Sequence, residues 1–313
     1  MDKLYIGVDI GGTTTKLGAF TADGQKLGQW AIRTEVQDGG THILPNAAAE
    51  IRRFAGSLSR VAGVGVGVPG PVRKDGMVSR CVNLGWAGFN PAEELAALLD
   101  GQIPVRAGND ANLAALGEYW QGSGRGARSI VLLTLGTGVG GGVIIDGHLV
   151  HGAHGLGGEI GHIVINPEEP LPCNCGHRGC LDQTASATGI ARWARRFLER
   201  SDAPSCLRDV PRLSAKAVLD AAKAGDALAC EVAEYCLGYL GRALSMVSYV
   251  VDPDRFILGG GVSRAGDYLL EVVQRHYAAD ATLLDTKADI VLAALGSDAG
   301  IYGAAYLAMG QGL

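Results

Sequence analysis

The 313-residue sequence lacks the features that direct a chain to a membrane, to nucleic acid or to export. No apolar run reaches the roughly 18 residues that a membrane span needs, and no basic stretch with an apolar core opens the chain as an export signal would. Positive charge is not in excess, because 27 Lys and Arg stand against 32 Asp and Glu, for a net charge of −5. We therefore expect a cytoplasmic protein with no nucleic-acid and no membrane partner.

Two common phosphate-binding patterns are also missing. No turn ends in the Gly-Lys-Ser/Thr of a P-loop. The spacing of Gly136, Gly138 and Gly141 matches G-x-G-x-x-G, but a dinucleotide fingerprint must open a helix, and the apolar residues 143–145 that follow predict a strand instead. The sequence therefore excludes both a P-loop and a Rossmann site.

Glycine is abundant, with 48 residues, about twice its usual share of roughly 7%, and no Gly-X-Y period suggests collagen. Residues 4–20 form two short apolar runs around a polar, glycine-bearing turn, which predicts a hairpin, and residues 130–145 repeat the scheme. This repeat predicts two related α/β halves facing each other across a cleft. Further strands are expected at 60–68, 105–108 and 255–258, and helices at 91–99, 111–120, within 184–250, at 267–276 and at 299–309.

Glycine-rich turns follow three of these strands, at Gly11-Gly12-Thr13, Gly136-Thr137-Gly138 and Gly259-Gly260-Gly261. One such segment alone is usually a tight turn. Backbone N–H groups and Thr hydroxyls in three of them can together bind the polyphosphate and nucleoside of a nucleotide.

Two aspartates lie where strands end. Asp9 precedes the first glycine turn, where a carboxylate can hold Mg²⁺ near phosphate oxygens or can hydrogen-bond its own turn. Asp110 lies where a strand gives way to a helix, so it can accept a hydroxyl proton or can cap the helix. The local sequence leaves both pairs of alternatives open.

Three cysteines, Cys173, Cys175 and Cys180, fall within eight residues. Thiolates this close can surround one tetrahedral metal ion, which needs a fourth ligand. His162 and His177 are the candidates, and we favour His162 because His177 lies inside the loop that the cysteines close. A closed site of four ligands is structural rather than catalytic. The remaining cysteines, Cys81, Cys206, Cys230 and Cys236, are expected to be ordinary thiols.

Seven segments, taken in order, resemble the motifs of the ROK family of repressors and sugar kinases, within the actin-like ATPase superfamily. The resemblance covers nearly the whole chain, and two of the segments resemble the bacterial glucokinases most. The segments are Asp9-Ile10-Gly11-Gly12-Thr13, Gly67-Val68-Pro69-Gly70, Asn83-Leu84-Gly85-Trp86, Asn109-Asp110-Ala111-Asn112, Leu135-Gly136-Thr137-Gly138-Val139-Gly140, Glu159-Ile160-Gly161-His162 and Cys173-x-Cys175-Gly176-x-x-Gly179-Cys180.

This resemblance implies a fold and an assembly. The fold is α/β, the actin-like ATPase (ribonuclease H-like) duplicated fold of two domains with a cleft. We expect a small N-terminal domain of residues 1–117 with 298–313, and a large domain of residues 118–297 that carries the zinc loop. The family also suggests a homodimer.

The resemblance further implies a reaction, the ATP- and Mg²⁺-dependent phosphorylation of the 6-hydroxyl of glucose with Asp110 as the general base. Six residues are expected to bind the sugar: Asn83, Asn109, Asp110, Glu159, His162 and Asp182. The nucleotide is expected to contact Asp9, Gly11, Gly12, Thr13, Thr14, Lys16, Gly136, Thr137, Gly138, Gly260 and Gly261. A structural Zn²⁺ is expected on His162, Cys173, Cys175 and Cys180.

One residue departs from the family pattern: where the family usually has a Glu that contacts the sugar, this chain has Asp182, one methylene shorter. Another hexose is therefore an alternative substrate, such as mannose, fructose, N-acetylglucosamine or N-acetylmannosamine. Polyphosphate is an alternative phosphate donor. A sugar-sensing ROK regulator is less expected, because the motif of Asp9 begins almost at once, without a helix-turn-helix segment before it, and the chain is acidic.

Overall fold

The computed structural model describes residues 3–312, apart from the side chains of Arg80 and Val82. The chain forms two compact units. The first comprises Met1–Ile130, Gly142–Gly158 and Ala294–Leu313, and the second comprises Val131–Gly141 and Glu159–Ala293. The mixture of sheets and helices confirms the α/β class, whereas the domain limits near residues 117 and 298 stay a prediction.

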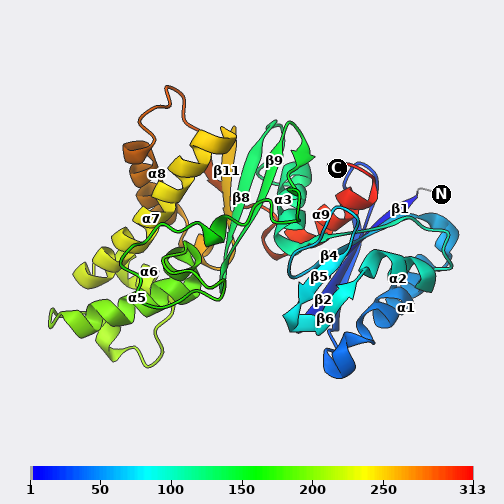
Figure 1. The fold of residues 1–313 in the computed structure, drawn as a ribbon, viewed down its shortest axis with the longest axis horizontal. Coiled ribbons are helices and arrows are strands. Elements are labelled where there is room, and N and C mark those ends of the chain that lie inside the picture. Colours follow the sequence, from blue (N-terminus) through cyan, green and yellow to red (C-terminus); the bar gives the residue numbers. More distant parts are fainter. Residues whose placement is uncertain (1–2, 313) are drawn as a thin grey trace. The chain divides into compact units, whose positions relative to one another are not determined.

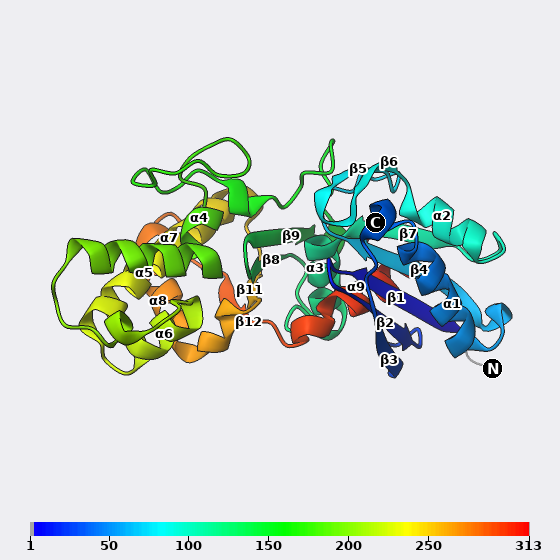
Figure 2. The same ribbon diagram turned by 90° about the horizontal axis from the view of Figure 1, so that it is seen from below.

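The first unit is built on a five-stranded sheet in the order β3-β2-β1-β4-β7, whose strands are all labelled in Figure 2. Its strands are β1 (Leu4–Ile10), β2 (Thr14–Phe20), β3 (Lys26–Arg33), β4 (Val61–Val68) and β7 (Val105–Asn109). The β1–β2 and β2–β3 pairs are antiparallel, which confirms the hairpin expected at residues 4–20, and β4 pairs in parallel with both β1 and β7. The helices of this unit are α1 (Ile43–Ala55), α2 (Pro91–Leu98), α3 (Asp110–Gln121) and α9 (Ala299–Ala308).

The two faces of this sheet differ in side-chain size. Residues alternate between the faces of a strand, and in the sequence of β4 valine alternates with glycine. The valines of β4 and the even-numbered residues of β1 lie in the core cluster that also holds the buried residues of α1 and α2. Each such side chain contributes about 1.5–3 kcal/mol on burial. Gly7 of β1 and the glycines of β4 lie on the opposite face, where Gly7 pairs with Gly65.

Helix α9 packs closely against this glycine face. A Cβ on Gly7 would lie 1.9 Å from the carbonyl oxygen of Ile301, and one on Gly65 would lie 1.8 Å from that of Ala304. Helix α3 packs on α9, and both views show the two side by side (Figures 1 and 2). The last helix of the chain therefore packs on elements from its first half.

A second five-stranded sheet has the order β10-β9-β8-β11-β12. Its strands are β8 (Ile130–Leu135), β9 (Val139–Ile145), β10 (His148–Leu149), β11 (Arg255–Gly259) and β12 (Asp289–Leu292). Strand β9 follows directly on the Gly136–Gly138 turn, so no helix opens there and the exclusion of a Rossmann site is confirmed.

The helices of the second unit follow the expected helical stretches. They are α4 (Asp182–Ala185), α5 (Ala187–Arg200), α6 (Ala215–Lys223), α7 (Ala227–Val251) and α8 (Asp267–Asp280). Helices α5 to α8 pack together around α7 (Figure 2), and Trp193 is fully buried among them.

Two further features complete the description. In the first unit, a small two-stranded sheet pairs β5 (Val78–Cys81) with β6 (Trp86–Phe89), and the expected sugar ligand Asn83 lies in the 3-10 turn between them. Within residues 3–312, no helix combines the length and the apolar character that a membrane crossing requires.

Candidate active site

In the first unit, three of the expected nucleotide ligands, Gly11, Gly12 and Thr13, form the turn between β1 and β2, and Thr14 and Lys16 follow on β2. The backbone N–H of Gly11 donates to the carbonyl of Thr14 at 3.0 Å, which closes the turn. Gly12, Thr13 and Thr14 are exposed, so their polar groups face solvent. Lys16 lies on β2 and donates from Nζ to the carbonyl of Ser297 at 2.8 Å, just before α9.

Asp9 lies on the glycine face of the sheet, near the start of α9. A Cβ on Gly300 would come within 2.5 Å of its Oδ2, so only glycine at position 300 leaves room for the carboxylate. Burial, followed by the negative charge of Asp110, raises the pKa of Asp9 from 3.8 to about 6, and Lys16 acts in the opposite direction. A buried carboxylate whose negative charge is opposed by a second carboxylate is typical of a site that binds a cation.

Asp110 is the first residue of α3, and its side chain is exposed. The N-cap is Asn109, whose side chain accepts from the backbone N–H of Asn112 at 3.1 Å and donates to the carbonyl of Gly70 at 3.0 Å. The alternative that Asp110 serves as the cap is therefore wrong. Its carboxylate, at the positive end of the helix dipole, acts electrostatically on Asp9 and on Cys81.

Asn83 belongs to the same region of the first unit. It follows Cys81 by two residues, and its side chain is exposed. The backbone groups of Leu84 and Asn83 interact with the Cys81 thiol, whose pKa is raised by burial and also by Asp110. Asn83, Asn109 and Asp110 are thus brought into one neighbourhood by the β5–β6 segment and the start of α3.

The second unit carries the Gly136–Gly138 turn. The N–H of Gly136 donates to the carbonyl of Gly138 at 2.9 Å, and Thr137 at the tip is exposed. A Cβ on Gly260 would lie 2.6 Å from backbone atoms of Leu135, so the turn after β11 lies beside this one. Gly261, next to it, has open space on the side where a Cβ would project. Both expected nucleotide turns of this unit therefore lie together.

Asp182 also lies at this turn. Its Oδ1 accepts a hydrogen bond from the backbone N–H of Val139 at 2.6 Å, and a Cβ on Gly138 would lie 2.5 Å from the same oxygen. The local sequence gave no sign of this contact, because 43 residues separate the partners.

The metal ligands predicted from spacing converge in the second unit. One possible ligand atom from each of His162, Cys173, Cys175 and Cys180 lies within 4.8 Å of all the others. His162 Nδ1 is 3.7 Å from Cys173 Sγ, and the sulfurs of Cys175 and Cys180 are 3.5 Å apart. Sulfur atoms bound tetrahedrally at roughly 2.3 Å from zinc are about 3.8 Å apart, so the cluster has suitable dimensions for such an ion.

The thiols of this cluster differ in proton affinity. Hydrogen bonding by the backbone N–H of His177 lowers the pKa of Cys175, and burial raises that of Cys180. His177 approaches Cys175 Sγ at 3.9 Å through Nδ1, but it does not belong to the four-residue group. His162 instead completes the group, as expected from the sequence.

Glu159 adjoins this cluster. It precedes the 3-10 turn Ile160–His162, and its Oε2 lies 4.0 Å from His162 Nε2. The imidazole of His162 thus directs Nδ1 toward the cysteines and Nε2 toward Glu159. Both side chains are about 40% exposed, so their remaining polar atoms are accessible to a ligand.

The family model described as the ROK family matches residues 5–311 of this chain. The chain belongs to the ROK family. A glucokinase from Halalkalibacterium halodurans is 42% identical over 319 residues, which cover 99% of this chain and 96% of that protein.

Solved ROK structures agree with this assignment. The ROK hexokinase from Thermus thermophilus is 30% identical with a TM-score of 0.83, and 98% of each chain is covered. A ROK family glucokinase from Streptomyces griseus, in complex with glucose and AMPPNP, is 32% identical with a TM-score of 0.76, covering 98% of this chain and 99% of that one. These neighbours confirm the actin-like fold expected of a ROK protein.

Reasoning from the ROK motifs alone missed two contacts. Gly300, which makes room for Asp9, comes from the last helix of the chain, and the contact of Asp182 with Val139 joins two distant segments. The repeated glycines of β4 were the available signal for the first contact, because they predict close packing on that face of the sheet.

Proposed function

We propose that this protein is an ATP-dependent glucokinase that transfers the γ-phosphoryl group of MgATP to the 6-hydroxyl of glucose. The observation that most supports this proposal is the position of Asp110. It is an exposed carboxylate at the start of α3, where Asn109 is the N-cap residue and Asp110 Oδ1 accepts from the backbone N–H of Ala111 at 2.8 Å. The 42% identity with a glucokinase over nearly the whole chain supports glucose as the sugar.

In the proposed reaction, the Asp110 carboxylate accepts the proton of the 6-hydroxyl as that oxygen attacks the γ-phosphorus. The new O–P bond forms while the bond to the leaving ADP oxygen breaks. Because little covalent chemistry falls to the protein, its contribution is mainly positioning and neutralisation of charge. Asn83, Asn109, Glu159 and His162 would pair with sugar hydroxyls, which discriminates against sugars that lack one.

The glycine turns would bind the donor. The exposed residues Gly12 to Thr14 and Thr137 offer N–H and hydroxyl groups that suit phosphate oxygens, and Gly260-Gly261 would approach the nucleoside. The raised pKa of Asp9 reflects buried negative charge beside Asp110, an environment that a divalent cation would relieve. Asp9 would therefore hold Mg²⁺, directly or through water, and the ion would offset the charge of the phosphates.

His162, Cys173, Cys175 and Cys180 would hold a structural Zn²⁺, since their donor atoms and spacing suit this ion. The ion would fix the loop and the orientation of the His162 ring, and so the direction of Nε2. It takes no part in the phosphoryl transfer.

The test measures ADP release with MgATP, and formation of the sugar 6-phosphate with polyphosphate as donor, across glucose, mannose, fructose, N-acetylglucosamine and N-acetylmannosamine. We expect glucose to have the highest kcat/KM. Asp110→Asn should lower kcat by about 10²–10⁴-fold while glucose binding, measured by calorimetry, is retained.

Asp100→Asn is the matched control, because Asp100 is a surface residue paired with Arg52. Near-normal kcat in Asp110→Asn would remove Asp110 from the role of base. A better sugar in the panel would replace glucose as the substrate. If glucose raises the melting temperature but no sugar is turned over, the chain is a sugar binder and the kinase proposal fails.

A further inference from the structure

Asp182 takes a position in this chain that its family resemblance does not predict. The resemblance implies a carboxylate that contacts the sugar, yet Oδ1 of Asp182 lies 2.6 Å from the backbone nitrogen of Val139. Val139 directly follows the Gly136–Gly138 turn. A hydrogen bond from an N–H to a charged carboxylate is roughly twice as strong as one between neutral groups, so this contact ties the end of the turn to Asp182.

The other end of the turn is tied to the same segment. The carbonyl of Gly136 accepts from the backbone N–H of Ala187 at 2.8 Å. Asp182 begins α4 and Ala187 begins α5. The turn is therefore held at both ends by residues 182–187, and Thr137 at its tip stays exposed.

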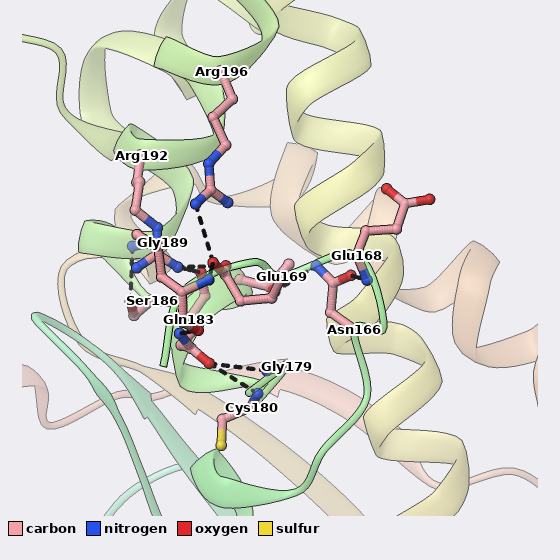
Figure 3. Close-up of polar contacts among 12 residues, drawn as sticks. Asn166, Glu168, Glu169, Gly179, Cys180, Gln183, Ser186, Gly189, Arg192 and Arg196 are labelled. Carbon is pink, nitrogen blue, oxygen red and sulfur yellow. Dashed lines mark hydrogen bonds and ion pairs between the residues drawn. The ribbon is translucent and has the colours of Figure 1, made fainter. Parts of the chain in front are cut away.

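A buried polar network fixes the backbone on both sides of Asp182 (Figure 3). The Oε1 atom of Gln183 accepts from the N–H groups of Gly179 and Cys180 at 3.0 and 3.3 Å, and its Nε2 donates to the carbonyl of Leu171 at 2.9 Å. The carbonyl of Gln183 in turn accepts from Arg192 at 2.6 Å. These contacts hold residues 179–183 in place.

The network ends in a buried carboxylate. The side chain of Glu169 is fully buried, and it pairs with Arg192 at 2.6 Å and with Arg196 at 3.1 Å (Figure 3). Arg192 is thereby held where it bonds the Gln183 carbonyl. Because the start of α4 is fixed in this way, the length of the side chain at position 182 decides where its carboxylate lies.

That length suits the turn. A Cβ on Gly138 would lie 2.5 Å from Asp182 Oδ1, so the carboxylate packs directly over this glycine. A Glu on the same backbone would carry its oxygens about 1.5 Å farther and would have to leave Val139 or displace the turn. The contact is thus particular to an aspartate at this position.

We infer that Asp182 is a positioning residue for the donor-phosphate turn, acting through the N–H of Val139 and through Gly138, rather than a sugar ligand. This inference rests on the proposed function, since it assigns the turn to the phosphates of MgATP. Asp182 then holds the exposed groups of the turn in the position from which they contact the donor. It does not affect the affinity for the sugar.

The test compares Asp182→Ala, Asp182→Asn and Asp182→Glu with the wild type. KM values for both substrates are measured, together with glucose binding by calorimetry without nucleotide. We expect Asp182→Ala to raise KM for MgATP about tenfold, as loss of a charge-assisted bond implies, and to leave the Kd for glucose within about twofold. Asp182→Asn keeps an acceptor oxygen and should recover part of the loss, whereas Asp182→Glu should not.

Hydrogen exchange over residues 136–142 gives a readout that does not depend on activity. Exchange at the Val139 amide should accelerate in Asp182→Ala and stay near that of the wild type in Asp182→Asn. Asp267→Asn is the control, because Asp267 is an exposed aspartate that also begins a helix of this unit. It should change neither the kinetics nor the exchange.

Two results would overturn the inference: a change in glucose Kd or KM with KM for MgATP unaltered, or unchanged exchange at Val139 in Asp182→Ala. If Asp182→Ala does not fold, the comparison of Asp182→Asn with Asp182→Glu decides by the same criteria. A wild type that phosphorylates no sugar refutes the proposed function instead, and the exchange experiment still tests the contact.

Discussion

Asp9 is held in an environment that opposes its charge, and replacing it with Asn should stabilise the unliganded protein. Burial and the nearby carboxylate of Asp110 raise the pKa of Asp9 from 3.8 to about 6. At neutral pH the carboxyl is charged in both the folded and the unfolded state, but the charge costs more in the folded state. The amide of Asn has nearly the same shape and carries no charge, so Asp9→Asn removes that cost.

The size of the effect follows from the shift of about 2 pKa units. At about 1.4 kcal/mol per unit, the charged Asp9 costs up to about 3 kcal/mol of folding free energy. Because the side chain is partly exposed, we expect about half of this. For a chain of this size, each kcal/mol shifts Tm by about 2 °C, so the expected gain is about 3 °C.

The gain in Tm that we expect from Asp9→Asn should depend on pH. Between pH 3.8 and about 6, the folded state holds more protons at Asp9 than the unfolded state does, so stability of the wild type falls as pH rises through this window. The Asp9→Asn variant does not lose stability in this way, because its amide does not titrate. The difference in Tm should therefore be small near pH 4, grow up to about pH 6 and stay constant above it.

Differential scanning calorimetry from pH 4 to 8, without nucleotide or metal, measures this difference. Asp100→Asn serves as the control, since its surface pair with Arg52 should shift Tm by only about 1 °C. In an Asp110→Asn background the gain from Asp9→Asn should shrink, because part of the cost is removed already. A Tm for Asp9→Asn equal to or below that of the wild type at pH 7 would refute the reasoning.

Three further substitutions test other parts of the structure. Cys180→Ser should lose bound zinc, measured by plasma mass spectrometry, together with thermal stability; one retained equivalent of zinc per chain would contradict the site. Gly65→Ala should lower the midpoint of urea unfolding, because its Cβ would lie 1.8 Å from the carbonyl oxygen of Ala304, and an unchanged midpoint would mean that α9 packs less tightly. Glu169→Gln should cost about 3 kcal/mol in urea unfolding, since it leaves two arginines without their buried counter-charge; a loss below about 1 kcal/mol would mean that the pairs contribute little.

Local pattern was sufficient to predict the elements around the site. The two strand-turn-strand segments were predicted because alternating apolar runs flank polar glycine turns, and the start of α3 was predicted from helical spacing. The sequence could not decide whether Asp110 caps α3, since aspartate is a good cap. The structure decides it through the backbone: Asn109 is extended, with φ −67° and ψ 144°, whereas Asp110 is already helical.

Non-local contacts were harder to predict. The preference for His162 over His177 as a metal ligand rested on loop geometry, which is local: the N–H of Cys173 bonds to the carbonyl of His177, which closes the loop on itself. By contrast, β12 is only four residues long and pairs with β11 across an intervening helix. Such a strand carries too little periodicity to be recognised.

Asp9 and Asp182 both pack against a glycine, but their surroundings suit them to different functions. In each unit a carboxylate oxygen lies 2.5 Å from where a glycine Cβ would project, Asp9 over Gly300 and Asp182 over Gly138. The charge of Asp182 is met by the N–H of Val139, so this carboxylate is suited to holding a turn. The pKa of Asp9 is raised, which marks its negative charge as under-compensated in the unliganded protein. Under the proposed function, a cation entering with the phosphates would be drawn to Asp9, and its binding would return the stability that this residue costs.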